Sequence, residues 1–162
     1  MFSEPRTFVI SSGEFDPSHL AIFISAFCMF IYETRRQTGL IVPPVFFVLD
    51  DAMSLAFGSL ARESEHVARP IVNWLLHARS LNINFCFSVQ NFAETSPAIR
   101  NNCQTLVCLG ATGQDAVELA RHMNLTPEQA RVIPQLTPGR GIILARGQYP
   151  LAVEVFIPMV EL

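Results

Sequence analysis

The stretch PPVFFVLDDAM, residues 43–53, decides the fold. Two prolines interrupt what precedes it, and five apolar residues then run into two adjacent carboxylates, Asp50 and Asp51. A run this short and apolar is typical of a strand buried on both faces, as in a parallel sheet. Acids at the carboxyl end of such a strand lie where open α/β sheets bind ligands, and they can hold a divalent cation or orient a water. The alternative is a solvated turn, because Asp is common in turns.

The composition fits one domain, residues 1–162, with a sizeable core. Half of the residues (50%) are hydrophobic and only 15% are charged. Such a chain is expected to cover part of its surface with a partner, with other subunits or with further chain. The net charge of −3 gives no global sign of nucleic-acid binding.

All 11 basic residues are arginines, because the sequence contains no lysine. This chain taken alone therefore cannot supply the phosphate-binding lysine of a P-loop. It also cannot form a Schiff base through lysine.

The four cysteines, at positions 28, 86, 103 and 108, form no C-x-x-C pair and have no metal-site spacing. They are expected to be reduced thiols, mostly buried, which suits a cytosolic compartment. No signal peptide is evident in the opening residues. The longest apolar run, residues 20–32, is shorter than the ~20 residues of a membrane span and predicts a buried core helix.

Periodicity and turn residues predict an alternation of strands and helices. The expected strands cover residues 6–10, 45–49, 81–90, 105–109, 141–145 and 151–157, and the expected helices cover 16–37, 65–79, 97–102, 114–123 and a segment that begins after residue 126. This order indicates an α/β fold with a largely parallel sheet, helices on both faces and an antiparallel hairpin at the end.

Two of the helices carry clear boundary signals. Asp16 and Pro17 suit the N-cap and first position of the long apolar helix, and Gly39 suits its end. Thr126, with proline next and Gln129 three residues on, predicts a capping box.

Several strand ends together resemble one known family. The acidic pair resembles a Walker B motif; ARSLNI at 78–83 precedes a strand that ends at Gln90, IRNNC follows at 99–103, and LTPGRG at 136–141 precedes the terminal hairpin. In order and spacing these segments resemble the FtsK/HerA superfamily of P-loop ATPases that pump DNA. Within it they are most similar to the conjugation and type IV secretion ATPases and coupling proteins. The resemblance covers about residues 7–158.

The resemblance implies a role for each matching residue. Asp50 would hold Mg²⁺ beside the nucleotide phosphates, and Asp51 falls where the family usually carries the glutamate that orients the attacking water. Asp is shorter than Glu, so hydrolysis is expected to be slow or to need a shifted water. Gln90 would face the γ-phosphate, and Arg79 would act as an arginine finger, often supplied across a subunit boundary. Arg100 is a weaker match for a phosphate or intersubunit contact.

Structural alternatives stand beside these roles. Arg79 also suits a solvated charge at a helix end, Gln90 a strand cap, and Arg100 a surface position.

The main departure from the family is the missing G-x-x-x-x-G-K-[ST] loop. By the resemblance, the chain is the C-terminal part of a RecA-like, three-layer ATPase core whose central Walker A strand is absent. That strand would lie between the strands at 81–90 and 105–109. Its absence would leave unpaired edges, unless the rest of the protein or another chain supplies the strand or the sheet closes up.

The resemblance therefore implies a segment of a ring-forming, hexameric motor that couples ATP hydrolysis to the movement of DNA or a protein–DNA complex. ATP and Mg²⁺ would be its cofactors in the full-length protein, and the isolated chain is expected to be inactive. Self-association, DNA and a membrane-bound secretion or conjugation complex are the implied partners, with the protein in the cytoplasm or at the inner face of the membrane.

Two other classes of protein are alternatives to an active motor. A non-catalytic relative in an assembly or regulatory role also fits Asp51 and the missing loop. A phospho-receiver does not fit, because its acidic pair closes the first strand, it needs a lysine, and no aspartate occurs here between Asp51 and Asp115.

Overall fold

The computed structural model describes residues 7–10, 17–51 and 77–158. The chain forms two compact units. The first contains Met1–Gln90 and Glu94–Ile99, and the second contains Asn91–Ala93 and Arg100–Leu162. Each unit is described by itself below, and the prediction of a single domain stays a prediction.

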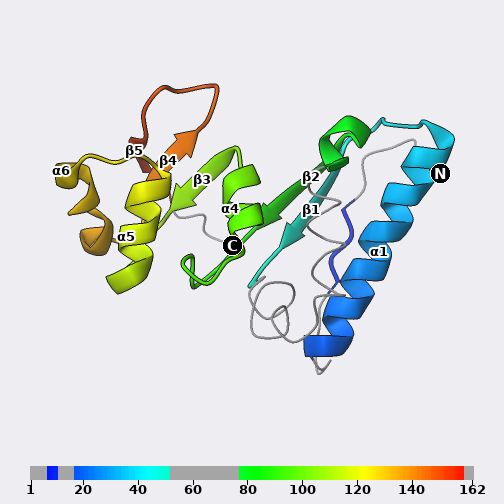
Figure 1. Cartoon of the computed structure of the whole chain (residues 1–162), viewed down its shortest axis with the longest axis horizontal. Helices are drawn as coiled ribbons and strands as arrows, with labels where there is room; N and C mark the ends of the chain where they lie inside the picture. The colour runs from blue at the N-terminus through cyan, green and yellow to red at the C-terminus, as the bar shows by residue number, and fades with distance from the viewer. Residues whose placement is uncertain (1–6, 11–16, 52–76, 159–162) are drawn as a thin grey trace. The chain divides into compact units, whose positions relative to one another are not determined.

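The first unit is a helix packed on a parallel pair of strands (Figure 1). Helix α1 (Pro17–Thr38) ends where predicted, because Gly39 takes a positive φ of 67° and its amide donates to the carbonyl of Arg35 at 2.9 Å. Strand β1 (Val45–Leu49) pairs in parallel with β2 (Ile83–Phe87), and Val45 lies opposite Ile83. A short 3₁₀ helix, η2 (Arg79–Leu81), leads into β2.

One face of this strand pair forms the core of the unit. Ile31, Ala78 and Ile83 are buried there. Aromatic rings extend the contact: Phe47 meets Phe27 of α1 edge-on at 6.1 Å and stacks on Phe85 at 5.2 Å. Alternate side chains of a strand point to opposite faces, so the helix covers one face only.

The prediction that β1 is buried on both faces is wrong for the described residues. Phe46 is 67% exposed and Val48 is 73% exposed, because α1 packs on the opposite face. The expected all-round burial of α1 is likewise wrong, since Phe23 and Phe30 are 49% and 55% exposed. None of the helices in the described ranges combines the length and apolar character that a membrane span requires.

Some predicted elements are absent or lie elsewhere. Residues 7–10 form no strand and are exposed, since no described strand pairs with them. Residue 16 and most of the predicted helix at 65–79 lie outside the described residues.

The second unit is built on an antiparallel sheet in the order β3-β4-β5. Its elements are α4 (Pro97–Asn102, which begins in the first unit), β3 (Thr105–Cys108), α5 (Gly113–His122), α6 (Pro127–Ala130), η3 (Ile133–Gln135), β4 (Arg140–Ala145) and β5 (Val153–Phe156). The predicted terminal hairpin is therefore confirmed, and so is the capping box: Thr126 accepts from the Gln129 amide at 3.3 Å.

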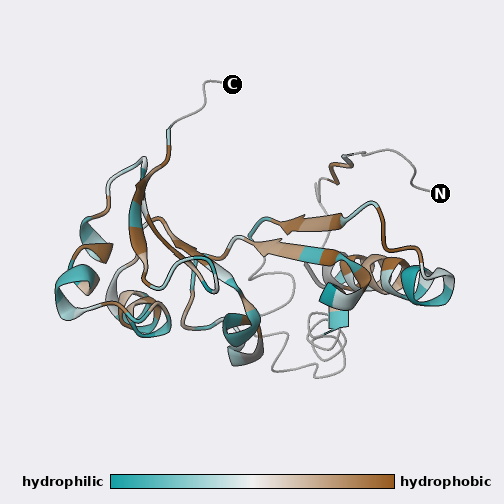
Figure 2. Cartoon of the chain, turned by 90° about the horizontal axis from the view of Figure 1, so that it is seen from above, coloured by the Kyte–Doolittle hydropathy of each residue, from teal (hydrophilic) through white to brown (hydrophobic). Residues whose placement is uncertain are grey.

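The core of this unit lies between the sheet and α5. Ile133 is 0% exposed and Met123 is 1% exposed, and both join the cluster that includes Leu106 and Ile142. The strands of both units are largely hydrophobic in Figure 2. Gly141 allows β3 and β4 to lie close, since a Cβ at this position would meet the Cys108 carbonyl oxygen at 3.1 Å.

The fold is thus α/β, with a small parallel sheet and a separate antiparallel sheet. Among the described strands the only parallel pair is β1 and β2, so the predicted single, mostly parallel sheet is not observed.

Candidate functional site

Asp50 and Asp51 lie directly beyond the carboxyl end of β1. Both are exposed, and the Asp51 amide donates to Asp50 Oδ1 at 3.1 Å. Asp51 takes a positive φ of 48°, a conformation that Asp adopts more readily than most residues. The strand therefore delivers two carboxylates to one sheet edge, on a backbone that turns sharply between them.

Gln90 lies at the same edge of the sheet. The parallel ladder continues past the strand, because the Ser88 amide donates to the Leu49 carbonyl at 3.0 Å. Asp50 and Gln90 therefore both follow the carboxyl ends of adjacent parallel strands, where ligands bind in open α/β sheets. Three of the five predicted residues, the two acids and Gln90, thus follow the same end of the parallel strand pair.

Arg79 lies at the opposite end of the strand pair. It begins η2, which precedes β2, and the Asn82 carbonyl accepts from the Val45 amide at 3.0 Å, beside the start of β1. A five-residue strand spans roughly 15 Å, so this separation is too large for Arg79 to reach a phosphate held at Asp50 in the same unit. If Arg79 contacts a nucleotide, that nucleotide belongs to another site.

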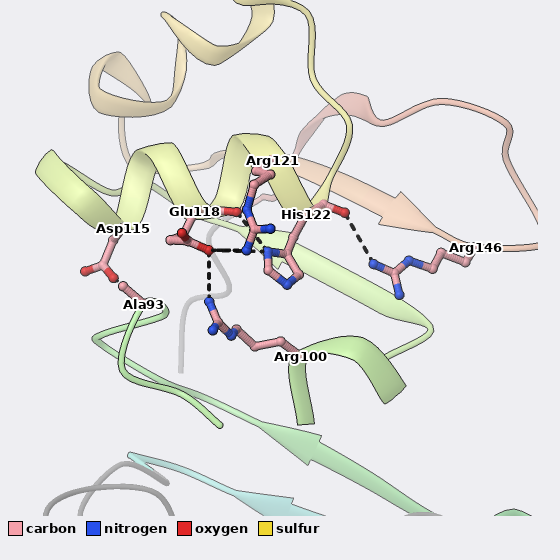
Figure 3. A network of polar contacts seen from close by, with 7 residues as sticks. All are labelled: Ala93, Arg100, Asp115, Glu118, Arg121, His122 and Arg146. Atoms are coloured by element: carbon pink, nitrogen blue, oxygen red, sulfur yellow. Dashed lines mark hydrogen bonds and ion pairs between the residues drawn. The ribbon is translucent and has the colours of Figure 1, made fainter. Parts of the chain in front are cut away.

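Arg100 belongs to the second unit, where it is 8% exposed. Its Nη1 donates to Glu118 Oε2 at 3.1 Å (Figure 3). Its guanidinium lies 5.5 Å from the centre of the Phe92 ring. Its Nε is buried and has no hydrogen-bond partner among the described residues. The alternative that Arg100 is a plain surface residue is therefore wrong.

Glu118 is the centre of this polar network (Figure 3). The same Oε2 accepts from Arg121 at 2.8 Å and lies 3.7 Å from His122 Nδ1. The hydrogen bond from Arg121 is the largest of the effects that hold the pKa of Glu118 below its ordinary value, and the charges of Arg121, Arg100 and His122 add to it. Glu118 thus neutralises a strongly basic neighbourhood.

The same helix also holds the segment that follows Gln90. Asp115 accepts from the Ala93 amide at 2.7 Å, and Phe92 is buried edge-on against the His122 ring at 5.3 Å. Asp115, Glu118 and His122 share one face of α5, at the helical spacing of three and four residues. That spacing was present in the sequence and could have indicated the network, which our sequence analysis missed.

Magnesium fits the acidic edge, whereas the phosphates of a nucleotide have few partners there. Carboxylate oxygens are the ligands Mg²⁺ prefers, and it usually takes only one or two from the protein. Within the described ranges no group of three or more His, Cys, Asp or Glu side chains could hold a metal ion. The sequence offers no lysine for phosphates, so these residues alone do not form a complete phosphate-binding site.

The cysteines take no part in this site. None of the four forms a disulfide, as predicted, but only Cys28 and Cys108 are buried, while Cys86 is exposed. Burial raises the pKa of the Cys28 thiol to about 12 and also raises that of Cys108. These two thiols therefore stay protonated near neutral pH and are poor nucleophiles.

Comparison with known proteins gives a fold. Neither protein-family models nor curated proteins match the sequence. Solved structures do: VirB4 of Thermoanaerobacter pseudethanolicus superposes with a TM-score of 0.68 at 13% identity over 92% of this chain. B204, the DNA-packaging ATPase from Sulfolobus Turreted Icosahedral Virus, superposes with a TM-score of 0.65 at 12% identity over 93% of this chain.

The expected resemblance to FtsK/HerA-type ATPases is confirmed at the level of the fold. The chain spans 40% of the length of the VirB4 structure and 66% of the B204 structure. In this fold, Asp50 and Gln90 each follow the carboxyl end of a parallel strand. The roles of the individual residues stay predictions.

Proposed function

We propose that this chain is a segment of a ring-forming ATPase motor that moves DNA or a protein–DNA complex. The observation that supports the proposal is that Asp50, Asp51 and Gln90 all follow the carboxyl ends of two adjacent parallel strands, in a fold shared with VirB4 and a DNA-packaging ATPase. The phosphate loop comes from chain outside this sequence. The same chain supplies the central strand of a RecA-like, three-layer core.

We assign the proposed roles to two nucleotides, because Asp50 and Arg79 lie at opposite ends of the strand pair. Asp50 holds Mg²⁺, Asp51 orients the attacking water and Gln90 faces the γ-phosphate, all at one edge. Arg79, at the other end of the strands, serves the nucleotide of a neighbouring subunit, where its planar guanidinium spreads positive charge over phosphoryl oxygens. Arg100 is the weakest candidate, because a phosphate would have to compete with Glu118 for it.

ATP and Mg²⁺ are the proposed cofactors of the complete motor. Titration calorimetry of this chain with MgATP should show no micromolar binding, since lysine and the phosphate loop are lacking. Micromolar binding would overturn the proposal that the site is incomplete.

The complete motor gives the positive test. Asp50→Ala and Asp51→Asn should each lower kcat for ATP hydrolysis by about 100-fold or more, because each removes a charge that acts at the transition state. Glu33→Gln, at an exposed position in α1, is the matched control and should leave kcat unchanged. Unchanged hydrolysis in both aspartate variants would refute the assignment of the site.

A second candidate is a non-catalytic subunit of a DNA-transfer or secretion machine. Asp51 favours it, because its carboxylate is shorter than the usual glutamate and its positive φ makes the backbone turn at this point. Asp51→Glu distinguishes the two: it should raise hydrolysis if Asp51 is a slow base, and it should have no effect in a subunit that never hydrolyses ATP.

The proposed partners follow from the proposed motor. Ring formation with other copies, DNA and a membrane-bound secretion or conjugation complex are proposed, with the chain in the cytoplasm or at the inner face of the membrane. The Phe46 and Val48 side chains, exposed on the uncovered face of β1, give such partners apolar surface.

A further inference from the structure

Arg35 is a buried cation without a carboxylate partner among the described residues. It lies in the last turn of α1, is only 6% exposed, and every hydrogen bond of its guanidinium ends on a backbone carbonyl. Burial lowers the pKa of its guanidinium, but an arginine stays charged at any ordinary pH. Burying a charged guanidinium costs desolvation free energy, and its hydrogen bonds to the surrounding carbonyls have to offset that cost.

The carbonyls belong to two segments that are far apart in the sequence. Nη1 donates to Ile41 at 3.1 Å and Nη2 to Pro43, both in the loop between α1 and β1. Nη1 also reaches Leu81 at 2.8 Å and Asn82 at 3.3 Å, in the turn before β2. One guanidinium thus ties the end of α1 to the entries of both strands.

The second of these segments is the turn that begins with Arg79. The Asn82 amide donates to the Arg79 carbonyl at 3.1 Å, and Asn82 takes a positive φ of 54° that closes the turn. The Asn82 side chain donates to the Ile41 carbonyl at 3.0 Å, so both bound segments are also joined to each other. Arg79 itself is exposed at the start of this closed turn.

We propose that Arg35 is a positioning residue for Arg79. By binding carbonyls of the 79–82 turn and of the 41–43 loop, Arg35 fixes the backbone position from which the Arg79 side chain extends. The inference rests on the proposed function, in which Arg79 reaches the nucleotide of a neighbouring subunit. An arginine finger needs a defined starting point, because misplacement by ~1 Å can cost about 100-fold in rate. The planar guanidinium of Arg35 fixes this position, because its donors reach both segments at once. The single ammonium of a lysine cannot reproduce that geometry.

The adjacent Arg36 provides a matched control. It has the same charge and lies on the same helix turn, but it is exposed and pairs with the Glu33 carboxylate at 2.7 Å. Arg36→Lys should therefore leave both the 79–82 turn and hydrolysis unchanged.

The first measurement is amide hydrogen exchange in this chain. In Arg35→Lys, exchange at Asn82 and Val45 should accelerate about 10-fold or more, because their hydrogen bonds close the bound turn. Arg36→Lys should match the wild type. Equal protection in Arg35→Lys would show that the arginine does not hold the turn and would overturn the proposal.

The second measurement separates positioning from general stability by a double-mutant cycle in the complete motor. Arg79→Ala should lower kcat by about 1,000-fold with little change in KM, and Arg35→Lys by about 10- to 100-fold. The double variant should be no slower than Arg79→Ala alone, because Arg35 acts through Arg79. A loss from Arg35→Lys that persists undiminished when Arg79 is already alanine would mean a structural effect only, and would refute the positioning role.

The two proposals can fail separately. If Asp50→Ala abolishes hydrolysis while Arg79→Ala does not change it, the motor assignment stands and the positioning role of Arg35 falls. If none of the variants, Asp50→Ala included, alters hydrolysis, the proposed function falls as well. A melting temperature of Arg35→Lys within a few degrees of the wild type ensures that the kinetic comparison concerns folded protein.

Discussion

The two units of the chain each bury an arginine, and they satisfy it in different ways. Arg35 is 6% exposed, and its partners among the described residues are all backbone carbonyls. Arg100 is 8% exposed and relies on the carboxylate of Glu118 and the face of Phe92. Burial is nearly the same, whereas the partners differ in charge and in whether they can titrate.

This difference teaches what each arginine can be used for. Carbonyl groups do not titrate, and buried contacts are only weakly screened by salt. The hydrogen bonds of Arg35 should therefore keep their strength when pH or salt changes. A carboxylate can be protonated, and Glu118 is shared with Arg121 and His122, so the Arg100 contacts depend on the state of one acid. The Arg35 contacts therefore suit a turn that keeps one conformation, whereas the Arg100 contacts suit a part of the structure whose stability changes with pH.

The largest expected loss of stability comes from Arg35→Ala. Four hydrogen bonds would be lost at once, although the Ile41 and Asn82 carbonyls each keep a second donor, and the free energy of unfolding of the first unit should fall by roughly 3–5 kcal/mol. Thermal denaturation followed by circular dichroism checks this, with Arg36→Ala expected to stay within about 0.5 kcal/mol. Equal losses in the two variants would remove the contrast between a buried and an exposed arginine.

Phe92→Ala should come next. The ring is 8% exposed and contacts both His122 and the Arg100 guanidinium, so its removal leaves a cavity and withdraws a cation–π partner. A loss of about 3 kcal/mol in the second unit is expected, and amide exchange at Ala93 should rise because its bond to Asp115 loses support. A loss confined to the first unit would contradict the assignment of Phe92 to the second.

Much of this architecture could be predicted from local chemistry in the sequence. Gly39, the Thr126–Gln129 capping box and the strand at 45–49 were located correctly, because each depends on a few neighbouring residues. The expected burial of Phe46 and Val48 was wrong, because burial depends on which elements cover a face, and that is not encoded in the strand itself.

The candidate site was predictable in part, for the same reason. Asp50 and Gln90 lie at the same edge because parallel strands share their direction, which the alternation of elements already indicated. The burial of Arg35 and of Arg100 depends on contacts between segments far apart in the chain. No local pattern distinguishes Arg35 from the exposed Arg36 beside it, apart from its place on the helix.

A pH titration of stability should separate the two arginines by mechanism. The pKa of Glu118 is lowered in the folded protein from its ordinary 4.5, so its contribution to stability is fully present above that value and is lost as the pH falls through the lowered pKa. Unfolding of the second unit should therefore become easier as the pH falls below about 4.5. In Glu118→Gln this part of the slope should disappear, while stability near neutral pH is lower than in the wild type because Arg100 loses its charged partner.

The Arg35 contacts supply the internal comparison for this titration. Neither an arginine nor a carbonyl changes charge between about pH 3 and pH 8, so exchange at Asn82 should not follow the titration of Glu118. Protection factors at Asn82 and at Ala93, which compare each exchange rate with the intrinsic rate of an unprotected amide at the same pH, test both statements in one sample. A common acid-dependent loss of protection at the two amides would show that one titration governs both units.

The smallest expected effect belongs to Thr126→Ala, which removes a helix cap far in sequence from both arginines. Its side chain accepts from the Gln129 amide, and the loss of one cap hydrogen bond should cost about 1 kcal/mol. Because Thr126 shares no contact with Glu118 in the described structure, the losses in Thr126→Ala and Glu118→Gln should add within about 0.5 kcal/mol in the double variant. Denaturant unfolding of the four proteins measures this. Strong coupling would mean that the Glu118 network extends through α5 to α6, and that Arg100 is part of a larger cooperative element than Arg35.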